Sequence, residues 1–138
     1  MRVVLDTNVL VSALLSAGHS PALLLDAWRD NRFELLTSHE QLGELARVTR
    51  YARLRPRIRP GDAGRLVNLL GDLAVVIESP AIVEISADPF DNFLPGLAIS
   101  GEADYLVTGD KADVLALKRV GRTKIVTARE MCRLLKLP

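Results

Sequence analysis

The chain has 138 residues, of which 49% are hydrophobic, and its formal net charge is +1. This length predicts a single domain over residues 1–138, and the apolar content excludes a disordered chain. The only cysteine, Cys132, excludes an internal disulfide, and its spacing to His19 and His39 indicates no zinc site. There is no apolar run of the roughly 18 residues that a membrane span needs, and no signal-peptide pattern. We therefore expect a cytoplasmic protein without membrane contact.

Short apolar runs alternate with segments of helical spacing along the chain. The apolar runs predict five strands, at residues 2–6, 33–37, 74–78, 103–108 and 124–126. The helical patterns predict helices at residues 8–16, 22–29, 38–51, 62–73, 92–100 and 111–117, and a last helix after residue 127. Such alternation is typical of an α/β fold, in which a parallel sheet carries helices on both faces.

Capping residues predict where several of these helices begin. Ser20 reads as an N-cap, with Pro21 at the first helical position. Two other helices are predicted to begin with a capping box, formed by Ser38 with Gln41 and by Thr127 with Glu130.

Four carboxylates stand where this fold could bring them to one edge of the sheet: Asp6, Glu44, Asp91 and Asp110. Asp6 ends the first predicted strand, and Asp110 follows the fourth by two residues. The working site of a parallel sheet lies beyond the carboxyl ends of its strands. Carboxylates gathered there without a basic partner would repel one another, and a divalent cation such as Mg²⁺ or Mn²⁺ would hold them together.

Each carboxylate also has a purely structural interpretation. Asp6 could cap the helix that follows it, and Asp110 could cap the next helix after Gly109. Glu44 could be a solvated helix residue that pairs with Arg47, three positions along. Burying an unpaired carboxylate at the end of a central strand is costly, however, and this favours a partner or a metal for Asp6.

Two registers are open for the helix that begins near Asp91. In the first, Asp88 is the N-cap and Pro89 the first helical residue, which leaves Pro95 deep inside the helix. In the second, Asp91 is the cap and Pro95 falls in the tolerant first turn. We favour Asp91, which makes Asp88 the weaker candidate, and whether Asp88 joins the site stays open.

Four segments together resemble the PIN-domain ribonucleases: LDTNVL (5–10), EL (44–45), DPFDN (88–92) and LVTGDK (106–111). The most similar branch is that of bacterial toxins of type II toxin–antitoxin systems related to virulence-associated protein C. The resemblance covers essentially the whole chain, including IVTARE at 125–130.

The resemblance implies a PIN-like, three-layer α/β/α sandwich around a mainly parallel sheet of four to five strands. It also implies cleavage of RNA with Mg²⁺ or Mn²⁺, a cognate antitoxin protein and a homodimer. Carried over by position, the catalytic and metal-binding quartet would be Asp6, Glu44, Asp91 and Asp110. Asn8 and Thr108 would support it, Asn8 by orienting Asp6 and Thr108 by donating a hydrogen bond to a carboxylate or a metal-bound water.

Seven arginines crowd residues 47–65, where Asp62 is the only acid. They could simply be an exposed, solubilising face. They could also form a phosphate-binding stripe, because arginine suits bidentate phosphate contacts and Tyr51 could stack on a base. The candidates for RNA binding are Arg47, Arg50 and Arg53.

Two other functions are compatible with parts of this pattern. A phosphorylatable receiver domain needs adjacent acids after its first strand, but Thr7 and Asn8 follow Asp6 here. A non-catalytic RNA- or protein-binding module of the same fold is the stronger alternative. An intact acidic quartet disfavours it, because clustered carboxylates repel phosphate.

Overall fold

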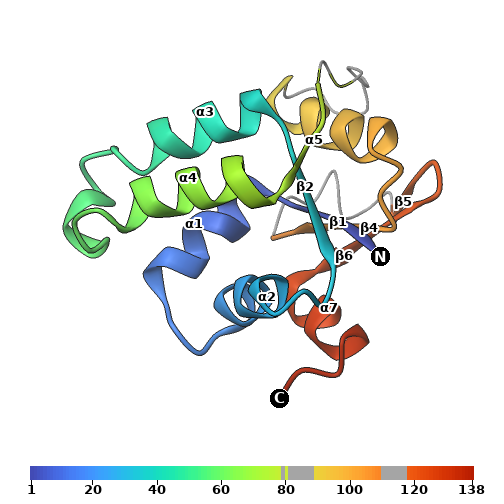
Figure 1. Ribbon diagram of the computed structural model, residues 1–138, viewed down its shortest axis with the longest axis horizontal. Helices are drawn as coiled ribbons and strands as arrows, with labels where there is room; N and C mark the ends of the chain where they lie inside the picture. The colour runs from blue at the N-terminus through green and yellow to red at the C-terminus, as the bar shows by residue number, and fades with distance from the viewer. Residues whose placement is uncertain (79, 81–88, 110–117) are drawn as a thin grey trace.

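The computed structural model in Figure 1 describes residues 1–78, 80, 89–109 and 118–138, and for residues 89–92 it describes the backbone alone. The predicted helix at 111–117, Asp88 and Asp110 lie outside the described residues.

Within the described residues, six strands form one sheet: β1 (Arg2–Leu5), β2 (Glu34–Thr37), β3 (Val75–Val76), β4 (Tyr105–Thr108), β5 (Arg119–Val120) and β6 (Thr123–Thr127). Their order is β3-β2-β1-β4-β6-β5. All neighbouring pairs are parallel except β5 with β6, which are antiparallel. The predicted α/β fold with a mainly parallel sheet is confirmed, and β5 is one short strand more than the sequence predicts.

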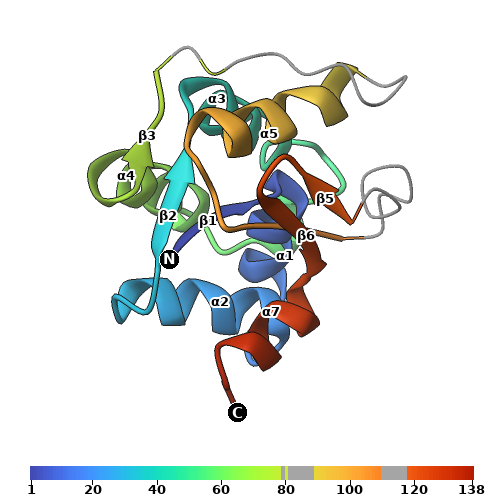
Figure 2. The same cartoon turned by 90° about the vertical axis from the view of Figure 1, so that its right-hand side faces the viewer.

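The helices of the described chain are α1 (Thr7–Leu15), α2 (Ser20–Arg29), α3 (His39–Val48), α4 (Asp62–Leu73), α5 (Pro89–Ser100) and α7 (Ala128–Leu134), with a short 3-10 helix, η1 (Arg55–Arg57). They lie on both faces of the sheet, with α5 on one side and α2 and α7 on the other (Figure 2). Alternate strand residues serve the two cores. Val3 and Leu5 of β1 pack towards α1 and α2, whereas Val4 packs towards α5.

The helix N-termini agree with most of the predicted caps. The hydroxyl oxygen of Ser38 accepts a hydrogen bond from the backbone N–H of Gln41 at 3.2 Å, and that of Thr127 accepts one from Glu130 at 3.1 Å. The predicted cap at Ser20 was wrong, because α2 begins at Ser20 itself and its N-cap is His19. Pro21 then lies at the second helical position, where its missing N–H still leaves no helical hydrogen bond unmade.

The predicted register of α5 was also wrong. This helix begins at Pro89, so Asp91 lies within its first turn rather than capping it, and Pro95 lies inside the helix. An interior proline costs roughly 3 kcal/mol. Leu94 and Leu97 pack against the sheet and are at most 4% exposed to solvent. Burying each side chain contributes about 1.5–3 kcal/mol. Burial of this face is therefore large enough to outweigh the cost of Pro95.

Within the described chain, no single helix is long and apolar enough to cross a membrane. The helices α1 and α2 meet that test of length and composition only as a pair, and they are bent by 99° relative to each other.

Candidate active site

A row of polar residues lies along the carboxyl edge of the sheet. Thr37 ends β2, Asp6 follows β1, Thr108 ends β4 and Thr127 ends β6. The strand order places the ends of β2, β1, β4 and β6 side by side, and the register brings Leu5 opposite Val107 and Thr108 opposite Thr127. Asp6, Thr37 and Thr108 are buried. This is the edge at which parallel α/β sheets bind their ligands.

Asp6 is the best-defined carboxylate of this edge. It is 1% exposed, and its backbone N–H donates to the carbonyl of Val107 at 2.8 Å. The hydroxyl of Thr108 donates to Oδ2 of Asp6 at 2.8 Å, as predicted for a neighbouring carboxylate. The backbone N–H of Asn8 donates to Oδ1 at 3.1 Å, so Asp6 also caps α1. Both oxygens thus have a donor, which fixes the orientation of the carboxylate and offsets part of its desolvation cost.

Asn8 orients Asp6 through its backbone rather than through its side chain. The Asn8 side chain is exposed and lines a pocket beside the sheet edge. The contact between the Asn8 backbone and Asp6 is therefore compatible with the predicted supporting role of Asn8. The side-chain amide of Asn8 can contact a ligand in that pocket.

Gln41 contributes a link that the sequence did not suggest. Its side-chain Nε2 donates to the carbonyl of Leu5 at 2.6 Å, and the Thr37 hydroxyl donates to its Oε1 at 2.7 Å. Gln41 is buried, and these bonds tie α3 to the ends of β1 and β2. The signal for it was a glutamine on the inward face of α3, where a polar side chain needs partners.

Glu44 lies three residues after Gln41, so the two side chains share one face of α3. Because Gln41 contacts Leu5, which precedes Asp6, this face of the helix is directed towards the start of α1. Glu44 is half-buried, and no ion pair joins it to Arg47 or to any other residue in the described part of the chain. The alternative in which Glu44 pairs with Arg47 therefore gains no support.

The other two acids of the predicted quartet, Asp91 and Asp110, have side chains outside the described part of the chain. Asp91 belongs to α5 by its backbone, and Asp110 lies outside the described residues, immediately after Gly109 in the sequence. Among the described side chains, no group of three or more His, Cys, Asp or Glu residues could hold a metal ion. The described site is thus Asp6 with Thr108 and Asn8, and the quartet stays a prediction.

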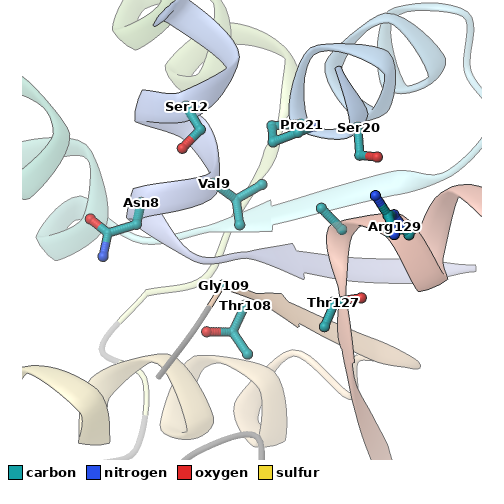
Figure 3. A pocket seen from close by; sticks show the side chains of 10 residues that line it. Asn8, Val9, Ser12, Ser20, Pro21, Thr108, Gly109, Thr127 and Arg129 are labelled. Carbon is teal, nitrogen blue, oxygen red and sulfur yellow. The ribbon is translucent and has the colours of Figure 1, made fainter. Parts of the chain in front are cut away.

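A pocket of about 540 Å³ adjoins Thr108 (Figure 3). Its walls come from α1, the start of α2, the ends of β4 and β6, and the start of α7: Asn8, Val9, Ser12, Ser20, Pro21, Thr108, Gly109, Thr127, Ala128 and Arg129. Among these, sequence reasoning had singled out Asn8 and Thr108 as candidates for the site and had missed Ser12 and Arg129.

Residues 2–112 match the family described as the PIN domain. The chain belongs to the PIN-domain family. It is 28% identical over 123 residues to the uncharacterized protein MJ1680 of Methanocaldococcus jannaschii, covering 86% of this chain and 76% of that protein. It is also similar to a chain of the crystal structure of VapBC2 from Rickettsia felis bound to a DNA fragment from their promoter, with a TM-score of 0.57 and 17% identity over 91% of this chain and 97% of that one. The predicted resemblance to PIN domains is confirmed, and the similarity to the VapBC2 chain is one of fold.

The arginine-rich segment of this PIN domain divides between two places. Arg47 is exposed in the last turn of α3, and Arg50 and Arg53 are exposed in the connection from α3 to α4. This connection leaves α3 at the end opposite to its N-cap, Ser38 (Figure 1). Three later arginines line a second pocket, of about 720 Å³, between the α1–α2 pair and α4: Arg57, Arg59 and Arg65. The structure therefore places three of the seven arginines at this second pocket, and the phosphate-binding stripe stays a prediction.

Proposed function

We propose that this PIN domain is a divalent-metal-dependent endoribonuclease and the toxin of a toxin–antitoxin pair. The observation that supports the proposal best is Asp6, a carboxylate buried at the carboxyl end of a central strand. Two donors hold it there in a fixed orientation. A carboxylate that served only as the cap of α1 would need the Asn8 N–H alone, whereas the Thr108 hydroxyl orients its second oxygen from another strand.

The donor set suits a hard cation. Mg²⁺ and Mn²⁺ prefer carboxylate oxygens and water, and the residues that would hold the ion are Asp6, Glu44, Asp91 and Asp110. When bound, the ion would supply hydroxide at neutral pH and positive charge for the phosphoryl transition state. The protein's own part is to fix Asp6 through Thr108 and Asn8, and to present Glu44 from α3 to orient a water.

The partners are proposals on the same footing. The similar chain from Rickettsia felis comes from a VapBC2 complex, which supports a cognate antitoxin for this chain as well. We further propose RNA as the substrate, a homodimer, and contacts from Arg47, Arg50 and Arg53 to RNA phosphates. A non-catalytic RNA- or protein-binding module is the alternative, and metal-dependent turnover distinguishes the two.

The test is cleavage of a structured RNA pool by the purified protein with Mg²⁺, with Mn²⁺ and with EDTA. Asp6→Asn is compared with Asp72→Asn, an exposed aspartate on α4. We expect cleavage that needs the metal, is lost in Asp6→Asn and is unchanged in Asp72→Asn. Full activity in a folded Asp6→Asn protein would refute the assignment of Asp6 as a catalytic residue.

A second readout does not depend on activity. A metal that binds only the folded protein at ten times its Kd stabilises it by about 1.4 kcal/mol, which raises the thermal midpoint. We expect this rise in the wild type and in Asp72→Asn but not in Asp6→Asn. If the metal raises the midpoint of Asp6→Asn equally, the ion is held elsewhere.

A further inference from the structure

The pocket beside Thr108 has an unusual composition for a site next to predicted carboxylates. Of the ten described residues that line it, Arg129 is the only charged one, and five others carry neutral polar side chains: Asn8, Ser12, Ser20, Thr108 and Thr127. Such a lining can donate and accept hydrogen bonds with a polar ligand, and its only formal charge is positive. The pocket volume, about 540 Å³, is within the range of small-ligand sites, roughly 300–1,000 Å³.

Arg129 is available for a ligand. It is exposed, and no described carboxylate pairs with it, whereas Arg65 pairs with Asp62 and Arg122 with Asp104. The adjacent acid, Glu130, interacts instead with Thr127, whose hydroxyl lies 3.2 Å from Oε1. In Figure 3 the Arg129 side chain lies on the same side of the pocket as Ser20, with Asn8 and Thr108 across from it.

The pocket and the candidate active site share a wall. Thr108 lines the pocket, and its hydroxyl donates to the Asp6 carboxylate. A ligand in the pocket would therefore lie next to the group proposed to act on RNA, without displacing it, since Asp6 itself is buried and does not line the pocket.

We infer that this pocket binds the nucleotide adjacent to the scissile bond, and that Arg129 holds the phosphate of that nucleotide. The inference rests on the proposed function and adds a substrate-positioning residue to it. A guanidinium presents two parallel N–H groups to a phosphate, and the neutral side chains can hydrogen-bond the ribose and the base edge. A positive charge here also offsets the repulsion between the RNA backbone and the nearby carboxylates.

The test pairs a protein variant with a substrate variant. Arg129→Ala, Arg129→Lys and the control Arg133→Ala are assayed on RNA oligonucleotides with one cleavage site. Arg133 is exposed on the same helix and does not line the pocket. Each oligonucleotide of the set carries one neutral methylphosphonate in place of one phosphate. The position of this substitution differs between oligonucleotides and covers both sides of the cleaved bond. Denaturation midpoints establish that the variants are folded.

We expect Arg129→Ala to lower kcat/KM about tenfold, mostly through KM, since it removes contacts to a charged phosphate. Arg129→Lys should keep part of the activity and Arg133→Ala all of it. In the wild type, one flanking methylphosphonate should cause a similar loss, and in Arg129→Ala that same substitution should cause no further loss. Losses that add at every position, or an Arg129→Ala protein as active as Arg133→Ala, would overturn the inference and leave the nuclease intact.

Failure of the proposed function gives a different result. If the wild type cleaves nothing, binding of the same oligonucleotides in EDTA decides the role of the pocket. If Arg129→Ala and one methylphosphonate each weaken binding, and the two losses in affinity do not add when they are combined, the nucleotide site is supported in a non-catalytic module. Binding that is insensitive to both would refute it.

Discussion

The hydrogen bond between Thr108 and Asp6 offers a direct test of how the candidate site is held. Thr108→Val replaces the hydroxyl by a methyl of similar size and keeps the β-branched shape that suits a strand. It removes the donor 2.8 Å from Oδ2 of a carboxylate that is 1% exposed. Hydrogen bonds to charged groups contribute about 1.5–3 kcal/mol, so we expect the free energy of unfolding to fall by roughly that amount in metal-free protein.

Thr123 provides a matched control at the other end of the sheet. It is buried on β6, and its hydroxyl donates to the carbonyl of Ala103 at 2.7 Å. Thr123→Val makes the same chemical change, but the acceptor is neutral, and a bond of that kind contributes about 0.5–1.5 kcal/mol. The difference between the two variants isolates the charge on Asp6.

The assay is urea unfolding in EDTA, followed by the fluorescence of Trp28, the only tryptophan and a buried one. The four proteins of a double-mutant cycle are the wild type, Thr108→Val, Asp6→Asn and the double variant. We expect the cost of Thr108→Val to shrink in the Asp6→Asn background, where the acceptor is no longer charged. The reasoning is refuted if Thr108→Val costs no more than Thr123→Val, or if its cost is the same in the wild-type and Asp6→Asn backgrounds.

Two further predictions concern packing and pH. Gly101→Ala places a Cβ 2.6 Å from Cδ1 of Leu36 and should destabilise by about 1–3 kcal/mol, whereas Gly43→Ala, in open space on α3, should stabilise by about 0.5–1 kcal/mol. Urea unfolding checks both, and a Gly101→Ala protein as stable as the wild type would show that Leu36 moves aside freely. The backbone N–H of Arg2, assisted by the Arg122 side chain, lowers the pKa of Asp104 in the folded protein. The resulting stabilisation is present above the unfolded pKa, about 3.9, and is lost as the pH falls through the folded pKa, so Asp104→Asn should flatten the acid side of a plot of thermal midpoint against pH. An unchanged slope in Asp104→Asn would contradict this assignment.

The strands were predictable because each central one is a run of apolar residues buried on both faces. Val3, Val4 and Leu5 illustrate this, since alternate side chains enter opposite cores. The hairpin strand β5 was not predictable. It consists of Arg119 and Val120, two residues that carry no periodicity, and it exists because the turn at Gly121, with φ of 56°, returns the chain beside β6.

The site was predictable where it depends on strand ends and unpredictable where it depends on packing between layers. Asp6 and Thr108 follow or end buried strands, so the rule for parallel sheets locates them. Gln41 read as half of a capping box, and only the docking of α3 against β1 shows that its side chain bonds Leu5. Arg129 carried no signal in the sequence, because its interest comes from the five described elements that surround one pocket.

The geometry of the Asp6–Thr108 pair is set by the core rather than by the hydrogen bond itself. The two residues are 102 positions apart and meet because Leu5 lies opposite Val107 in the register of β1 and β4. A slip of one residue would exchange the faces of Val4 and Leu5, both fully buried in different cores. Each side chain would then enter a core shaped for another residue, and such mismatched packing typically costs about 1–3 kcal/mol, so the apolar residues of β1 together match or outweigh the roughly 1.5–3 kcal/mol of the bond to Thr108. The carboxylate can therefore be replaced, as in Asp6→Asn, without the register being lost, which is why activity and fold should separate in that variant.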